Sequence, residues 1–180
     1  MIKFKQYPSQ SRLKELFDYI DGHLVWKARP RSDFKTPQGY GAFNALRVGK
    51  IACQGRINGY WIIKISREYF YAHRLIWIWN YGDLEYGQEI DHKDGDKENY
   101  SLSNLRIADR QQNTSNRGAQ SNSKTGVKGV CWDKSKNKWH AQIKLGGKLI
   151  RKRFVEFDDA VEFARKTREE LHGEFHNHGD

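Results

Sequence analysis

Residues 89–117 carry the pattern that limits the possible folds of this chain most strongly. Their sequence, EIDHKDGDKENYSLSNLRIADRQQNTSNR, predicts a short strand that leads into Asp91 and His92 and a turn at residues 94–96. A second strand is expected over residues 105–108, and a helix should follow it. The segment therefore predicts a unit made of strand, loop, strand and helix.

The start of that helix should bring chemically useful side chains together. Asp109 is a favourable N-cap residue, and Gln112 follows three residues later, as in a capping box. This start places Asn113 one turn into the helix, where it can face back across the hairpin toward Asp91 and His92. We therefore expect a carboxylate, an imidazole and an amide to converge.

Such a set of side chains suits phosphodiester hydrolysis. A hard divalent ion takes oxygen ligands from a carboxylate and an amide carbonyl, and a neutral imidazole can deprotonate water. A simpler interpretation is that the aspartates of this segment only form turns. In that case Asn104 caps a strand and Asn113 is a solvated helix residue. For any one of these residues alone, the simpler interpretation is preferred.

Three short motifs of this segment together resemble the ββα-metal motif of HNH endonucleases, specifically the phage and intron homing type. They are DH at 91–92, SNLR at 103–106 and QNTSN at 112–116. The upstream segments GYWIIKI and AHRLIW also resemble the lead-in of that family, so the likeness spans roughly residues 11–117. It implies a nuclease that hydrolyses double-stranded DNA with one divalent ion, Mg²⁺ or Mn²⁺, per active site.

The resemblance also implies a role for each matching residue. Asp91 and Asn113 would hold the metal, and His92 would be the general base. Asn104 would orient the His92 ring through its amide oxygen. The third letter of the motif is Asn rather than His, which is similar to the homing branch and lowers the expectation of a zinc site of the colicin type. His73 and Arg74 could touch phosphate, although a hydrogen-bonded structural histidine explains His73 equally well.

Charge points to the same class of partner. The chain has 32 Lys and Arg against 22 Asp and Glu, a net charge of +10, which favours nucleic acid. Residues 124–153 alone hold ten basic residues and one acidic residue, whereas residues 156–170 hold six acidic residues against three basic ones. This opposition predicts a basic sheet that faces DNA and an acidic helix that faces solvent.

The basic segment reads as a hairpin around Gly146-Gly147. Counting outward from this turn pairs residue 144 with 149 and residue 139 with 154. One face then holds Trp139, Ala141, Ile143, Ile150 and Phe154, and Lys152 alone interrupts it. A helix whose apolar stripe is Val155, Phe157, Ala160, Val161 and Ala164 should cover that face. The other face holds His140, Gln142, Lys144, Arg151 and Arg153, whose donors suit the major groove.

Residues 124–175 resemble the Apetala-two type DNA-binding domain, in which a three-stranded sheet enters the major groove and one helix packs behind it. Together the two resemblances imply an α+β chain. It would have an N-terminal ββα-metal (HNH) nuclease fold after a small antiparallel sheet, and a C-terminal three-stranded sheet with one helix. We place the nuclease domain at 1–117, a Gly-, Ser- and Asn-rich linker at 118–125 and the second domain at 126–180.

Other patterns predict the helices and strands of the first domain. The spacing of Leu13, Leu16, Phe17 and Ile20 predicts a helix over residues 11–20. Residues 23–29 and 59–66 read as strands, and residues 72–81 as a buried helix that stops at Gly82.

Several classes of protein are excluded or disfavoured. No apolar run approaches the roughly 18 residues of a membrane span, and the N-terminus has no signal-peptide core, so cytoplasm is expected, that of the host cell if the chain is phage-encoded. Cys53 and Cys131 lie far apart, which argues against a four-cysteine zinc site. His172, His176 and His178 resemble a metal tract, but a polar tail with adventitious metal affinity is the preferred interpretation, and they are given no catalytic role.

The leading hypothesis is thus a site-preferring, metal-dependent DNA endonuclease, acting as a monomer or weak dimer on DNA without an obligatory protein partner. The alternative is a DNA-binding regulator in which the HNH-like hairpin is catalytically silent. The presence of all four matching residue types disfavours that alternative. The DNA contacts expected from both domains are His73, Arg74, Arg106, Arg110, Arg117, His140, Gln142, Lys144, Arg151 and Arg153.

Overall fold

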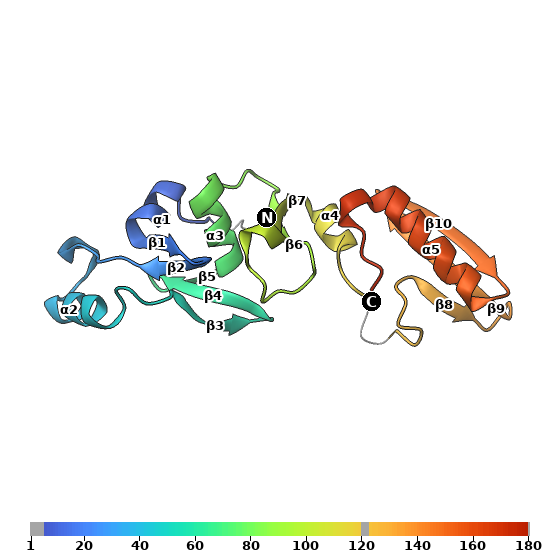
Figure 1. Ribbon diagram of the computed structural model, residues 1–180, viewed down its shortest axis with the longest axis horizontal. Helices are drawn as coiled ribbons and strands as arrows, with labels where there is room; N and C mark the ends of the chain where they lie inside the picture. Colours follow the sequence, from blue (N-terminus) through green and yellow to red (C-terminus); the bar gives the residue numbers. More distant parts are fainter. Residues whose placement is uncertain (1–5, 120–122, 180) are drawn as a thin grey trace. The chain divides into compact units, whose positions relative to one another are not determined.

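The computed structural model describes residues 6–119 and 123–179, and it confirms an α+β chain with several small antiparallel sheets (Figure 1). Within these ranges no helix combines the length and the apolar character needed to cross a membrane.

The chain divides into two compact units. The first comprises Met1–Tyr86 and Asp96–Arg106, and the second comprises Gly87–Gly95 and Ile107–Asp180. The predicted domain boundary at 117/118 does not coincide with this division and stays a prediction. Part of the predicted linker, residues 120–122, lies outside the described residues.

The first unit opens with helix α1, Gln10–Leu16, whose N-cap Ser9 accepts a hydrogen bond from a backbone amide of the first turn. Leu13 and Leu16 are buried, as the helical spacing predicts. The predicted extension of this helix to Ile20 is wrong, however, and that residue is 49% exposed.

A hairpin replaces the end of the predicted helix. Strand β1, Phe17–Ile20, pairs with β2, His23–Trp26, around Asp21 and Gly22, which have φ angles of 49° and 82°. An Asp-Gly pair favours such a two-residue turn, because both positions need a positive φ. This local signal overrides the helical spacing that runs through it.

The middle of the first unit is a three-stranded antiparallel sheet in the order β3, β4, β5. The strands are Cys53–Ile57, Tyr60–Ile65 and Glu68–Tyr71, which confirms the predicted strand at 59–66. Before the sheet lie a 3-10 turn, Arg31–Asp33, and helix α2, Pro37–Leu46. The sequence analysis did not predict α2, whose start is marked by the N-cap Thr36 and by Pro37 in its first turn.

Helix α3, Ala72–Tyr81, has the predicted bounds and ends at Gly82, where φ is 106°. Trp79 joins it to the β1 strand by donating its ring N–H to the carbonyl of Phe17 at 3.1 Å. The core of this unit gathers the buried faces of α1, α3 and the two sheets; its fully buried members include Leu13, Phe17, Ile63, Leu75 and Ile78.

The segment from residue 89 has the predicted succession of elements. Strand β6, Glu89–His92, pairs with β7, Leu105–Ala108, and a 3-10 turn, Leu102–Asn104, precedes β7. Helix α4, Arg110–Ser115, follows, and its Asp109–Gln112 capping box is present with both hydrogen bonds.

The C-terminal part of the second unit is a three-stranded sheet covered by one helix. The strands are β8, Val130–Asp133, β9, Lys138–Leu145, and β10, Lys148–Phe154, and they lie in the order β10, β9, β8. Helix α5, Phe157–His172, and a 3-10 turn, Gly173–Phe175, follow. The predicted β9–β10 register is confirmed from the 144–149 pair to the 139–154 pair.

The packing of α5 on the sheet agrees with the predicted parity. Ala141, Ile143, Ala160 and Ala164 are buried together. The Lys152 ammonium lies on this side, 5.2 Å from the ring centroid of Phe154 and 5.4 Å from that of Phe163. Two members of the predicted contact are wrong: Val155 precedes the helix and is 68% exposed, and Ile150 of β10 is 36% exposed and stays outside the buried cluster. Phe163 and Leu171 complete the contact instead.

Candidate active site

Asp91 and His92, the predicted metal ligand and general base, end strand β6 and are almost completely buried, with exposures of 5% and 4%. The carbonyl of His92 accepts a hydrogen bond from the amide of Gly95 at 2.9 Å. Gly95 has a φ of 75°, a conformation that a residue with a β-carbon rarely adopts. This turn ends β6 directly after the two residues and fixes the backbone from which they project.

Asn116 binds the Asp91 carboxylate, a contact that the sequence analysis missed. Its Nδ2 lies 3.0 Å from each carboxylate oxygen of Asp91 and donates also to the carbonyl of His92 at 2.6 Å. All three partners are acceptors, so the orientation of the Asn116 amide is fixed. One side chain therefore ties both residues at the end of β6 to the end of α4.

Asn113, the second predicted metal ligand, donates through Nδ2 to Oε2 of Glu89. A sequence signal for this pattern was available. Glu89 and Asp91 are two apart on a strand and lie on one face, and Asn113 and Asn116 are three apart on a helix and lie on one face. These spacings place two carboxylates on one side and two amides on the other, so that each amide can face one carboxylate.

The donor set fits a hard divalent cation. Carboxylate and amide oxygens are the ligands that Mg²⁺ and Mn²⁺ prefer. The Oδ1 atom of Asn116 is buried and has no hydrogen-bond partner among the described residues, although the side chain is only 4% exposed. A buried acceptor without a donor is costly, and a bound ion or an ordered water would offset that cost.

Asn104, the residue predicted to orient the His92 ring, belongs to the first unit and is 9% exposed. Its Nδ2 donates to the carbonyl of Asn99 at 2.8 Å. Because this bond fixes the amide, Oδ1 is the atom of Asn104 that can accept a hydrogen bond from another group, as the predicted role requires. The pairing of Asn104 with His92 stays a prediction.

The two predicted phosphate contacts on α3 are turned inward. His73 is 4% exposed and stacks on the ring of Tyr71, with 5.7 Å between centroids and 17° between planes. Arg74 is half-buried and donates to the hydroxyl of Tyr7 at 3.3 Å. These contacts favour the structural interpretation of His73 and give Arg74 a packing role.

The polar face of the C-terminal sheet presents the predicted side chains to solvent. Gln142, Lys144, Arg151 and Arg153 are exposed and His140 is half-exposed. Arg153 forms an ion pair, through Nε to Oδ2 of Asp133 at 3.0 Å. Hydrogen bonds from Ser135 and from Arg153 lower the pKa of Asp133 to about 2.

A cavity of about 590 Å³ lies in the second unit, between α4, the β9–β10 hairpin and the end of α5. Its lining includes the predicted DNA contacts Arg110, Gln142 and Lys144, together with Lys128 and Arg168, and no acidic residue. Such a lining suits an anion.

Lys128 joins the C-terminal part of this unit to α4. Its Nζ donates to the carbonyl of Ser115 at 2.7 Å and to that of Arg117 at 2.5 Å. Burial, with the nearby charges of Arg168 and Arg117, lowers the pKa of Lys128 to about 8. Of the remaining predicted DNA contacts, Arg106 is half-buried, and Arg110 and Arg117 are exposed.

Comparison with known proteins agrees with the nuclease class that the β6–β7 hairpin and α4 indicate. Residues 70–115 match the family model described as HNH endonuclease, so the chain carries an HNH domain. It is also 33% identical, over 103 residues, to Protein 3.8 of Escherichia phage T7; the match covers 57% of this chain and 85% of the phage protein. The chain therefore belongs to the same family as that protein. No solved structure matches the chain significantly.

Proposed function

We propose that this protein is a site-preferring, divalent-metal-dependent endonuclease of double-stranded DNA, of the homing type. The observation that carries the proposal is the buried Asp91–His92 pair at the end of β6, held by Asn116 within the segment that matches the HNH family. Burying a carboxylate next to an imidazole costs free energy of folding unless hydrogen bonds or a bound ion offset it. Such pairs are therefore concentrated at functional sites.

In this proposal His92 is the general base that takes a proton from the attacking water. Asp91 and Asn113 are the oxygen ligands of one Mg²⁺ or Mn²⁺ ion, and Asn104 positions the imidazole. Asn116 holds the Asp91 carboxylate in one orientation, and Glu89 does the same for the Asn113 amide. When bound, the ion would supply a positive charge that stabilises the leaving oxygen.

Binding is assigned mainly to the C-terminal module, which we propose to be of the Apetala-two type. Its exposed sheet face carries Gln142, Lys144 and Arg151, side chains that can donate to base edges or phosphates. The cavity lined by Arg110 and Lys128 supports an additional phosphate contact. We propose that the protein acts as a monomer or weak dimer, in the host cytoplasm, as its phage relative suggests.

The test is incubation of supercoiled plasmid and long linear DNA with the protein and Mg²⁺, Mn²⁺ or a chelator, followed by mapping of the ends. Metal-dependent breaks at preferred positions are expected, and nicking is expected if one chain acts alone. A silent HNH fold in a DNA-binding regulator would instead shift the mobility of the DNA and leave every phosphodiester bond intact with either metal.

A further inference from the structure

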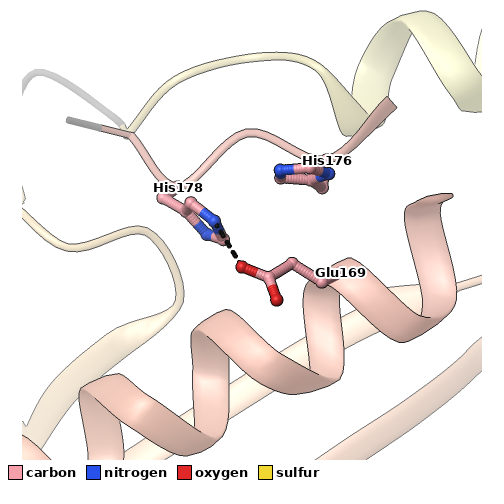
Figure 2. Close-up of side chains that lie close together, drawn as sticks. All are labelled: Glu169, His176 and His178. Atoms are coloured by element: carbon pink, nitrogen blue, oxygen red, sulfur yellow. Dashed lines mark hydrogen bonds and ion pairs between the residues drawn. The ribbon is translucent and has the colours of Figure 1, made fainter. Parts of the chain in front are cut away.

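Three potential metal ligands meet at the C-terminal end of the second unit. Glu169 projects from α5, and His176 and His178 follow the 3-10 turn after it (Figure 2). One ligand atom from each lies within 4.8 Å of the other two. In the part of the chain that the structure describes, this is the place where three histidine, cysteine or carboxylate ligands come so close.

His176 already has the arrangement of a metal ligand. Its Nδ1 lies 2.6 Å from the carbonyl oxygen of Gly173. A carbonyl can only accept, so in the neutral ring Nδ1 carries the proton and Nε2 is the nitrogen with a lone pair for a metal. Metal-bound histidines usually donate their second ring N–H to a carbonyl or carboxylate in this way, which fixes the tautomer and the ring orientation.

His178 and Glu169 are joined by a hydrogen bond whose proton an ion could replace. The Nε2 atom of His178 lies 3.1 Å from Oε1 of Glu169, and its Nδ1 lies 3.1 Å from Nη1 of Arg168. A guanidinium only donates, so the proton is on Nε2 and points to the carboxylate. An ion bound at Nε2 would require the other tautomer of His178, with its proton on Nδ1. The hydrogen bond between Nδ1 and Nη1 of Arg168 would then break. Arg168 would keep its hydrogen bond from Nη2 to the carbonyl of Lys128.

We propose that Glu169, His176 and His178 bind a divalent transition-metal ion of the zinc type, and that this ion fastens the C-terminal segment to α5. Two imidazoles and one carboxylate favour Zn²⁺ and its neighbours over Mg²⁺, and they leave a fourth position for water. The site is thus distinct in chemistry from the oxygen-rich nuclease site, and it does not depend on nuclease activity.

The fastened segment has a structural consequence within the same unit. The carbonyl of His178 accepts a hydrogen bond from the amide of Lys128 at 3.4 Å, and the side chain of Lys128 binds the end of α4. An ion that holds residues 176–178 against α5 would therefore stabilise the strand-and-helix module and its connection to α4. His172, which does not belong to the triad, is not needed for this site.

The experiment is a Co²⁺ titration of the metal-stripped full chain, with excess Mg²⁺ present to occupy the nuclease site and Zn²⁺ added afterwards as a competitor. We expect one Co²⁺ with the visible absorption of a four-coordinate site, which Zn²⁺ then abolishes. Glu169→Gln and His176→Ala should each weaken Co²⁺ binding about tenfold or more. Glu170→Gln is the matched control, because it removes the same charge from the neighbouring residue of α5, and it should bind Co²⁺ as the wild type does.

Thermal unfolding gives a second readout on the same proteins. Zn²⁺ should raise the Tm of the wild type and of Glu170→Gln but not that of Glu169→Gln. The proposal is overturned if the wild type gives no such absorption, or if Glu169→Gln and His176→Ala bind Co²⁺ as tightly as Glu170→Gln.

Discussion

The HNH hairpin and the C-terminal sheet hold their functional side chains in opposite ways. In the hairpin, Asp91 and His92 are buried and bonded by a neighbouring amide. On the sheet, Gln142, Lys144 and Arg151 stand exposed on strands whose register is set by one glycine turn. Burial and hydrogen bonds hold a reactive group in one geometry, whereas exposure leaves charged side chains available to a polyanion. We infer that the first region cuts and the second binds.

The largest effect is expected for the general base. Replacing His92 with alanine should lower the cleavage rate about 10²- to 10⁴-fold, because proton transfer from water loses its acceptor. Single-turnover cleavage of a mapped site measures this rate. His140→Ala is the control, since it removes a histidine from the sheet, and at saturating protein it should cleave as fast as the wild type.

Removing the amide that holds Asp91 should lower the stability of the folded chain. Asn116→Ala leaves the buried carboxylate and the His92 carbonyl without this donor, at a cost of about 1 to 3 kcal/mol in the free energy of unfolding. Asn113→Ala should cost less, because its partner Glu89 is only half-buried. Urea unfolding of both variants measures the difference, and equal stabilities would show that the Asp91–Asn116 contact is unimportant.

Three neighbouring substitutions on β10 test which face of the C-terminal sheet binds DNA. Arg151→Ala should weaken DNA binding about tenfold, within the range for one good arginine contact. Arg153→Ala should weaken it less, because this arginine also pairs with Asp133. Lys152→Ala should leave affinity nearly unchanged and instead lower stability slightly, since its ammonium lies over two rings. Fluorescence anisotropy with labelled duplex measures all three, and Lys152→Ala as the most damaging change would refute the binding face.

The smallest effect is a dependence of stability on pH that comes from Lys128. Its pKa is lowered from 10.5 to about 8 in the folded chain, so between these values the unfolded chain binds a proton that the folded chain has released. The free energy of unfolding should therefore rise with pH through this window and be flat below it. After screening by solvent we expect about 1 kcal/mol or less. Lys128→Met should lack this rise when both proteins are unfolded in urea across the window.

Local signals in the sequence predicted much of both regions. The Gly146-Gly147 turn fixed the register of β9 and β10, and the Asp109–Gln112 box fixed the start of α4. The same kind of signal, Asp21-Gly22, interrupts the helical spacing of residues 11–20 and forms the turn between β1 and β2. Turn and cap residues act on their own backbone, so they are more reliable than spacing where the two disagree.

Side-chain partners were harder to predict than elements. Residue types indicated Asp91, His92 and Asn113, but the partner of Asp91 is Asn116, one turn further along α4. Which amide faces which carboxylate depends on how the helix is placed against the strand, a tertiary property. The proposed ligands Glu169, His176 and His178 come together for a similar reason, because a 3-10 turn folds the chain back onto α5.

The division between cutting and binding is tested most directly by comparing His92→Ala and Arg151→Ala on one DNA site, with affinity and single-turnover cleavage measured for each. The account predicts that His92→Ala binds within a few fold of the wild type but cleaves at least about 100-fold more slowly. It predicts that Arg151→Ala binds about tenfold more weakly but cleaves at the wild-type rate once saturated. Wild-type cleavage by His92→Ala, or a parallel loss of binding and saturated cleavage in both variants, would contradict it.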